Sequence, residues 1–97
     1  MKINKDGTRV TFISKDPWYS KERLGFKQNT VRRFCTVEQR ESLEAEMLIS
    51  SLYTLQEIEI REAATNQSFI RLLSDVSYYD GTFIFSWIHQ GDVGSVP

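Results

Sequence analysis

The sequence predicts an α+β domain built on a small, strongly curved antiparallel sheet or small barrel, with two helices at its rim. Three observations support this class. The 97 residues suffice for one domain. Two segments with helical signals interrupt the β-rich first half, and three β-rich segments separated by turns fill the last third. The predicted order is β-α-β-α-β-β-β, with residues 1–89 forming the domain and residues 90–97 a flexible tail.

A short helix is predicted over residues 17–24. Asp16 can accept hydrogen bonds from the first free amides of a helix, and proline is tolerated at the first helical position. Gly25 is a typical residue at which a helix ends. Trp18 and Leu24 are expected to face the core. The charged residues of the helix are expected to face water: Lys21, Glu22 and Arg23.

The strands on either side of this helix have mixed faces. In residues 8–14 and in residues 30–35 the side chains divide between two faces with a period of two, which indicates extended structure. Each face of the second strand carries one arginine, Arg32 or Arg33, so burying either face would bury a cation. We therefore expect the second strand to form a sheet rim or the wall of a cleft. Cys35 is interpreted as a buried small apolar residue.

A longer helix is predicted over residues 37–52. Thr36 and Gln39 have the spacing of a capping box, in which the hydroxyl and the amide satisfy each other's backbone amides. One face carries the acidic residues Glu38, Glu41 and Glu44. The opposite stripe is apolar and is expected to face the core: Leu43, Met47, Leu48 and Leu52.

The last third of the chain predicts an antiparallel meander. Its three strands are expected over residues 55–62, 69–76 and 82–88, since each segment is rich in β-branched or aromatic residues. Turn-forming residues separate them at 65–68 and 79–81. The aromatic residues of the last two strands are interpreted as core rather than as a base-stacking surface: Tyr78, Tyr79, Phe83 and Phe85.

Charge is distributed unevenly along the chain. Residues 1–36 carry a net charge of +6 and residues 37–97 carry −7, which gives the overall −1. The halves either form a basic and an acidic face, of which the basic one attracts phosphates, or interleave and neutralise each other. Cys35 is the only cysteine, which suits a reducing compartment. No signal peptide or spanning segment is evident, so we expect a cytoplasmic protein outside the membrane.

Residue counts argue against the usual metal and cofactor sites. Cys35 and His89 are single residues of their types, so no common zinc ligand set exists, and no nucleotide-binding glycine motif occurs. We expect no metal and no cofactor. His89 is interpreted as a residue at a strand end, and Glu57 and Glu59 as part of a solvated sheet face rather than as paired catalytic carboxylates.

The densest polar chemistry lies in residues 21–33, around the end of the first helix. The cations and amide or hydroxyl groups there suit contact with phosphates and polar base edges, but they also suit an ordinary solvated basic surface. Both interpretations stay open at this stage. The residues concerned are Lys21, Arg23, Lys27, Asn29, Thr30, Arg32 and Arg33.

This stretch resembles ASCH domains, small members of the PUA-like superfamily. Their short helix ends in a Gly-x-Lys-x-x-Thr-x-Arg type motif, which matches Gly25, Lys27, Thr30 and Arg32 in register. The resemblance implies a PUA-like β-barrel and a cleft that handles RNA or a nucleotide. The chain departs from the family in two ways: the helix over residues 37–52 replaces the Gly-Asp turn expected after the motif, and residues 63–97 contain no glutamate.

Three functions follow from these patterns. The first is an RNA- or nucleotide-binding module. Its pocket would be lined by Lys27, Asn29 and Thr30, and phosphates would be contacted by Lys21, Arg23, Arg32 and Arg33. The second, implied by the resemblance, is an amidohydrolase of acetylated nucleosides, in which Lys27 and Thr30 work with a glutamate from later in the chain. Residues 63–97 contain no glutamate, so that group would come from Glu57, Glu59 or Glu62.

The third function is a protein-interaction module. In its size and general character the sequence also resembles small accessory proteins of phages and prophages, and this resemblance implies a phage-encoded modulator of a host enzyme. Its acidic helix face would then contact a basic surface of the host protein.

Overall fold

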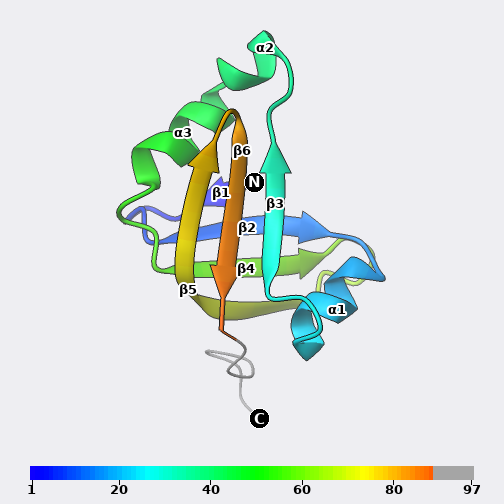
Figure 1. The fold of residues 1–97 in the computed structure, drawn as a ribbon. Helices are drawn as coiled ribbons and strands as arrows, with labels where there is room; N and C mark the ends of the chain where they lie inside the picture. Colours follow the sequence, from blue (N-terminus) through cyan, green and yellow to red (C-terminus); the bar gives the residue numbers. More distant parts are fainter. Residues whose placement is uncertain (89–97) are drawn as a thin grey trace.

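A computed structural model describes residues 1–88 as six strands in one curled, half-barrel sheet, with three helices around it (Figure 1). This confirms a small curved α+β fold. His89 and the tail predicted over residues 90–97 lie outside the described residues. The strands are β1 (Lys2–Ile3), β2 (Arg9–Ser14), β3 (Asn29–Arg33), β4 (Glu57–Glu62), β5 (Ser68–Tyr79) and β6 (Thr82–Trp87). The helices are α1 (Trp18–Leu24), α2 (Val37–Arg40) and α3 (Leu43–Ser51).

The sheet is mixed, so the prediction of a wholly antiparallel sheet is wrong. Its strand order is β1-β2-β4-β5-β6-β3, and β2 runs parallel to β4 with Phe12 opposite Ile60. Between these strands the chain passes through α1, β3, α2 and α3 and then returns, which is the long crossover that a parallel pair requires. The predicted meander of β4, β5 and β6 is confirmed as antiparallel.

The curl of the sheet comes from β5, whose first part pairs with one neighbouring strand and whose second part pairs with another. Residues 68–72 pair with β4, whereas residues 73–79 pair with β6. The register shifts between Leu73 and Asp75, where an irregularity of the β-bulge type bends the strand. At its far end, Asp80 and Gly81 both have positive φ, which gives the tight hairpin that the turn residues predicted.

The core lies inside this curl, where β2 and β6 face each other. The Phe12 and Phe85 rings meet with centroids 5.1 Å apart, and Phe83 lies 6.2 Å from Phe85. Both phenylalanines of β6 are fully buried, as predicted, but Tyr78 and Tyr79 are exposed. The remaining core is mostly aliphatic and aromatic: Val10, Tyr19, Leu48, Leu55, Ile58, Ile60, Phe69 and Trp87.

Helix α1 buries a different face from the one predicted. Trp18 is 54% exposed and Leu24 is 64% exposed, while Tyr19 and Glu22 are buried. A helix of two turns buries one narrow stripe, and residues three apart share it. Glu22 was expected to face water, but its carboxylate has partners inside the fold. The predicted helix stop is confirmed, because Gly25 has φ 89°.

The helix predicted over residues 37–52 is two helices, α2 and α3. The predicted capping box of Thr36 and Gln39 is present. A second cap follows at Ser42, whose hydroxyl accepts from the Ala45 amide and so begins a new helix. This break changes the buried stripe: Leu48 is buried as predicted, but Leu43 is 72% exposed.

Strand β3 ends earlier than predicted, and this exposes Cys35. The strand stops at Arg33, two residues before the cysteine, and the chain then turns into α2. Cys35 is therefore an exposed free thiol, and the prediction that it is buried is wrong. Within β3 the alternation is as expected, with Thr30 buried and Val31 exposed.

Candidate functional site: a pocket at the seam of the half-barrel

The half-barrel has a seam between β2 and β3, which are not neighbours in the sheet. A pocket of about 510 Å³ lies at this seam, between the end of β2, the start of α1 and the length of β3. We call it the seam pocket. Its lining comprises Ile13, Ser14, Lys15, Trp18, Glu22, Lys27, Thr30, Val31 and Arg32.

Local backbone features bring the motif residues to this pocket. Gly25 ends α1 in the left-handed conformation, and the Lys27 amide then donates to the Lys21 carbonyl at 3.1 Å. This tight return directs Lys27 back toward the helix. The alternation of β3 then turns Thr30 and Arg32 inward together. Helix stop and strand period therefore place three motif side chains around one space.

Glu22 is the carboxylate of the seam pocket. It is 1% exposed, and both of its oxygens have partners. The Ser14 hydroxyl donates to Oε1 at 3.0 Å, and the Lys27 ammonium donates to Oε2 at 3.3 Å. The ammonium also donates to the Asn29 carbonyl at 2.8 Å. Since burying a charge without a partner is costly, this pairing with Lys27 is what allows Glu22 to lie inside the fold.

Arg32 is the least satisfied of the partly or fully buried charged groups in the seam pocket. Its guanidinium lies over the Phe12 ring, 4.4 Å from the centroid, and Nη2 donates to the Ile13 carbonyl at a long 3.4 Å. Its Nε is buried without a hydrogen-bond partner among the described residues. Burial lowers the pKa of Arg32, and the nearby carboxylates of Glu22 and Glu44 oppose that shift. Arg32 thus lines the pocket with one long hydrogen bond, and its unpartnered Nε is itself shielded from solvent.

The mouth of the pocket is apolar and partly aromatic. Ile13, Trp18 and Val31 are all exposed and line it. The Lys21 ammonium lies 5.0 Å from the Trp18 ring centroid, in a cation–π contact. On the inner wall, Thr30 is 4% exposed. Small-molecule sites commonly combine an apolar and aromatic lining with a few placed polar groups.

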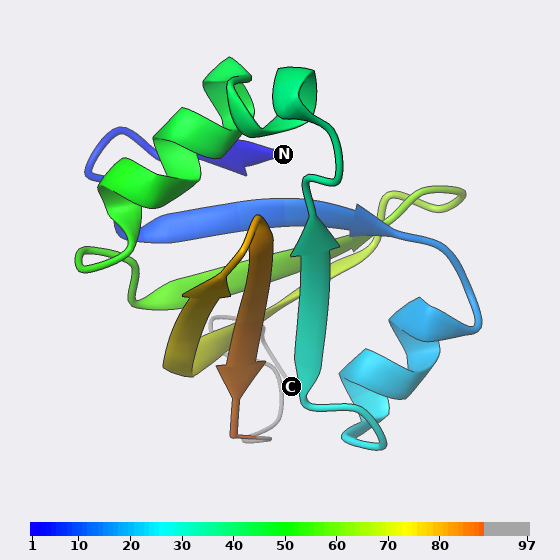
Figure 2. The same cartoon turned by 45° about the horizontal axis from the view of Figure 1, so that its top comes forward.

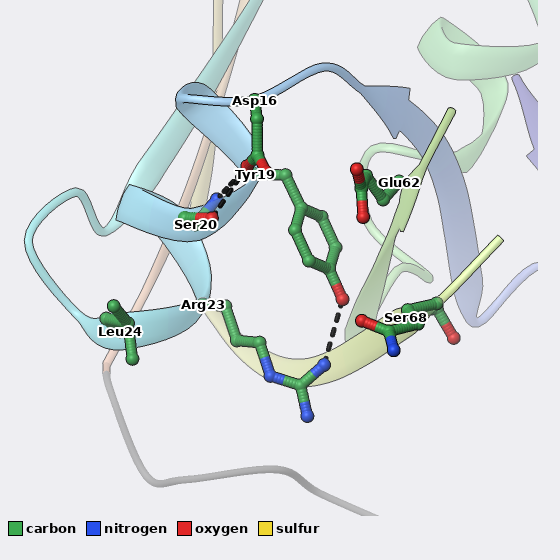
Figure 3. A pocket seen from close by; sticks show the side chains of 8 residues that line it. Asp16, Tyr19, Ser20, Arg23, Leu24, Glu62 and Ser68 are labelled. Carbon is green, nitrogen blue, oxygen red and sulfur yellow. Dashed lines mark hydrogen bonds between the residues drawn. The ribbon is translucent and has the colours of Figure 1, made fainter. Parts of the chain in front are cut away.

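The other predicted ligand-binding residues lie elsewhere. Arg33 and Asn29 are on the outward face of β3, and Asn29 reaches the site only through its backbone carbonyl. Arg23 lines a second pocket, of about 480 Å³, on the other side of α1 (Figure 3). There its Nη1 donates to the Tyr19 hydroxyl at 2.9 Å. Of the predicted cations, Lys27 and Arg32 therefore line the seam pocket, whereas Arg23 lines the second pocket and Arg33 lies on the outward face of β3.

The three glutamates considered from the sequence do not line the seam pocket. They lie on β4, where Glu57 pairs with Arg9 and Glu59 with Arg61, and Glu62 lines the pocket that Arg23 shares. The carboxylate beside Lys27 comes instead from α1, earlier in the chain. One signal was available: Glu22 stands three residues before Gly25, and Lys27 two residues after it, so a tight stop brings them together.

Residues 1–88 contain no cluster of three histidine, cysteine, aspartate or glutamate side chains that could hold a metal ion. In the same part of the chain no helix is long and apolar enough to cross a bilayer. Comparison of the chain with protein-family models, with curated proteins and with solved structures found no match. The resemblance to ASCH domains therefore stays a prediction that depends on the motif residues.

Proposed function

We propose that the seam pocket binds a nucleotide, either free or as an unpaired nucleotide of RNA. The observation that supports this best is a weakly hydrogen-bonded Arg32 in the pocket lining beside an exposed Trp18. A nucleotide carries an anion and a flat ring on one small molecule, and it would use both features at once.

The charge of the seam pocket favours an anion. Its lining holds three cations and one carboxylate, a surplus of two positive charges. The Lys27 ammonium is engaged by Glu22 and Asn29, so Lys15 and Arg32 carry the surplus. A phosphate can accept two hydrogen bonds from a guanidinium, and this would satisfy donors that the protein itself leaves without good partners.

The rim favours a flat partner for the rest of the ligand. Bases stack on exposed aromatic rings irrespective of sequence, and Trp18 provides such a ring at the mouth. Below the rim, the lining also contains the polar side chains of Thr30 and Glu22, which are 4% and 1% exposed. The proposal includes a PUA-like barrel and membership of the ASCH domains, since Gly25, Lys27, Thr30 and Arg32 match that motif.

Tryptophan fluorescence tests this proposal directly. Trp18 is 54% exposed whereas Trp87 is 2% exposed, so quenching by a ligand reports on the pocket. We expect 5′-mononucleotides to quench the emission and the matching nucleosides to bind more weakly. Binding should weaken with added salt, because phosphate contacts are screened. Trp18→Phe removes the reporter and serves as the control for signal from Trp87.

Two arginine variants make the test specific. Arg32→Ala should weaken mononucleotide binding by at least about tenfold, the loss expected for a charge-assisted hydrogen bond. Arg33→Ala on the outward face should change it by less than about twofold, as expected of an exposed charge. Equal effects of the two substitutions would contradict binding in the seam pocket.

A second candidate function is hydrolysis of N-acetylated nucleosides. The observation that favours it is the buried Glu22 carboxylate 3.3 Å from Lys27. Proton transfer from the ammonium to Glu22 would leave an amine that can accept the Thr30 hydroxyl proton as Oγ attacks the acetyl carbonyl. The tetrahedral intermediate would then collapse with cleavage of the C–N bond, and the Lys27 ammonium would protonate the departing nitrogen, so that the nucleoside leaves with its free amino group. Water would hydrolyse the acetyl ester of Thr30, which releases acetate and restores the hydroxyl.

Turnover decides between the two functions. Folded protein is incubated with a panel of N-acetylated nucleosides, and the deacetylated products are separated by chromatography. Hydrolysis should be lost in Thr30→Val, which keeps the shape of the side chain but removes the hydroxyl. Absence of turnover by the unaltered protein would eliminate this second function and leave the binding function in place.

A further inference from the structure

Strand β3 is an edge strand, and one of its backbone edges is open. In the described part of the chain it pairs only with β6, at the end of the strand order. The Trp87 amide donates to the Gln28 carbonyl at 3.0 Å, and the Phe34 amide donates to the Gly81 carbonyl at 2.8 Å. Because alternate residues of an antiparallel strand bond to the same neighbour, the even-numbered residues of β3 bond to β6.

The odd-numbered residues therefore present their backbone groups to the open edge. These residues are Asn29, Val31 and Arg33. The Asn29 carbonyl is used by the Lys27 ammonium, while Val31 and Arg33 offer amides and carbonyls in strand geometry. Such a row is a template for a further strand.

The outward face beside this edge is apolar at its centre. Val31 and Ile84 are directly opposite each other on neighbouring strands, and both are 38% exposed. No helix covers this face of β3 and β6 in either view of the fold (Figures 1 and 2). A strand added to β3 would extend the sheet and cover part of this apolar pair.

We propose that the open edge of β3 binds an extended, acidic segment of another protein by strand addition. Charge specifies the partner, because cations flank the edge on both faces. Arg33 lies on the outward face and Arg32 on the inward one, and Lys15 lines the adjoining seam pocket. Acidic side chains on alternate sides of an incoming strand would meet these cations.

Two other occupants fit less well. A second copy of this chain paired through β3 would bring two Arg32 and two Arg33 side chains together, and like charges across paired strands are destabilising. Charged residues on edge strands in fact protect against such self-pairing. A nucleic acid can accept from the amides of the edge, but its phosphates cannot donate to the carbonyls. A peptide strand satisfies both.

The probe for this inference is a fluorescein-labelled, C-terminally amidated octapeptide in which pairs of valines alternate with pairs of glutamates, so that an extended peptide carries glutamates on both faces. Binding is followed by fluorescence anisotropy. We expect the labelled peptide to bind, and the same peptide with lysine in place of glutamate to bind at least about tenfold more weakly. No binding of the acidic peptide at millimolar concentration would overturn the inference.

Substitution of Val31 separates strand addition from simple charge attraction. Val31→Pro removes an amide that points away from β6, so it leaves the internal ladder intact and blocks the open edge. It should abolish peptide binding. Val31→Thr keeps the amide and the strand preference, and it should bind within about threefold of the unaltered protein. Equal peptide binding by both variants would contradict strand addition.

A measurement on the unaltered protein covers the case in which the proline variant does not fold. Amide hydrogen exchange by NMR should slow at Val31 and Arg33 when the acidic peptide is added, with little change at Thr30 and Arg32. Unchanged exchange at Val31 would overturn the inference. The inference would also be overturned if a single-stranded oligonucleotide bound to the protein and the acidic peptide did not, since this would assign the edge to nucleic acid.

Discussion

The seam pocket and the outer face of β2 and β4 both mix positive and negative side chains, but they differ in how completely the charges are paired. We call the outer row the charge ladder, which consists of Arg9, Thr11, Glu57, Glu59 and Arg61. In the ladder every member has a partner. In the seam pocket the Glu22–Lys27 pair is complete, but the half-buried Arg32 is not fully paired.

The charge ladder follows the register of two parallel strands. Arg9 is opposite Glu57, and its Nε and Nη2 donate to the same carboxylate oxygen at 3.2 and 3.1 Å. Glu59 accepts from the Thr11 hydroxyl at 3.0 Å and from Arg61 at 2.9 Å. Such cross-strand pairs stabilise a sheet by modest amounts each, and their completeness requires no ligand to explain it.

The seam pocket differs because Arg32 stays poorly satisfied at a half-buried position. An arrangement that costs stability persists where it has a use, and functional sites are where such costs concentrate. Partner completeness, rather than the number of charges, therefore distinguishes the seam pocket from the charge ladder. Each prediction below changes one side of this comparison.

The largest effect is expected from breaking the complete pair of the pocket. Glu22→Gln leaves the Lys27 ammonium without its carboxylate in a mostly buried setting, and it should lower the free energy of unfolding by about 2–4 kcal/mol. Chemical denaturation measures this value. In the ladder, Glu57→Gln should cost less than about 1 kcal/mol, because both partners are partly exposed.

The double variant Glu22→Gln with Lys27→Met tests the cause of that loss. Removing both charges should recover part of the stability, since no unpaired ammonium is left. If the two substitutions are additive instead, the ion pair is not what holds Glu22 in place.

Local signals in the sequence predicted the parts of the fold that depend on neighbouring residues. The Gly25 stop, the capping box at Thr36 and the Asp80-Gly81 hairpin all follow from conformational preferences of a few adjacent residues. The parallel pairing of β2 with β4 depends on where a long crossover returns, so it has no local signature. Likewise, the chain bends at Ser42, and this residue caps a second helix there. The helix predicted over residues 37–52 is therefore divided into α2 and α3.

The candidate site was likewise predictable where it depends on local spacing and not where it depends on tertiary packing. Lys27, Thr30 and Arg32 were singled out by spacing, and they line one pocket. Glu22 was missed because its burial depends on which face of α1 packs on the sheet, and two exposed apolar residues of that helix suggested the opposite face. Arg33 was grouped with Arg32 from charge alone, yet strand alternation sends them to opposite faces.

A smaller effect of opposite sign is expected from the incomplete cation. Arg32→Met keeps an unbranched side chain over Phe12 and removes a desolvated guanidinium with an unsatisfied Nε. It should raise the free energy of unfolding by about 1 kcal/mol while mononucleotide binding is lost. Arg33→Met on the outward face should change stability by less than about 0.5 kcal/mol. A destabilised Arg32→Met protein would show that the guanidinium is structural.

The smallest effect concerns the pH dependence of the ladder. Burial alone would raise the pKa of Glu59, but hydrogen bonds from Ser68 and Thr11 and the charges of Arg61 and Arg9 together lower it below the ordinary value of 4.5. A carboxylate with a lowered folded-state pKa stabilises the fold above its unfolded-state pKa, and this stability is lost as pH falls through the folded-state pKa. Glu59→Gln should therefore remove roughly 1 kcal/mol or less at pH 7 and flatten the decline of stability below about pH 4.5.

Denaturation curves of both proteins between pH 7 and pH 3 measure the difference, which should shrink toward the acid end. A difference that grows on acidification would mean that Glu59 is held in its neutral form by the fold, and the ladder would then be incompletely paired like the seam pocket.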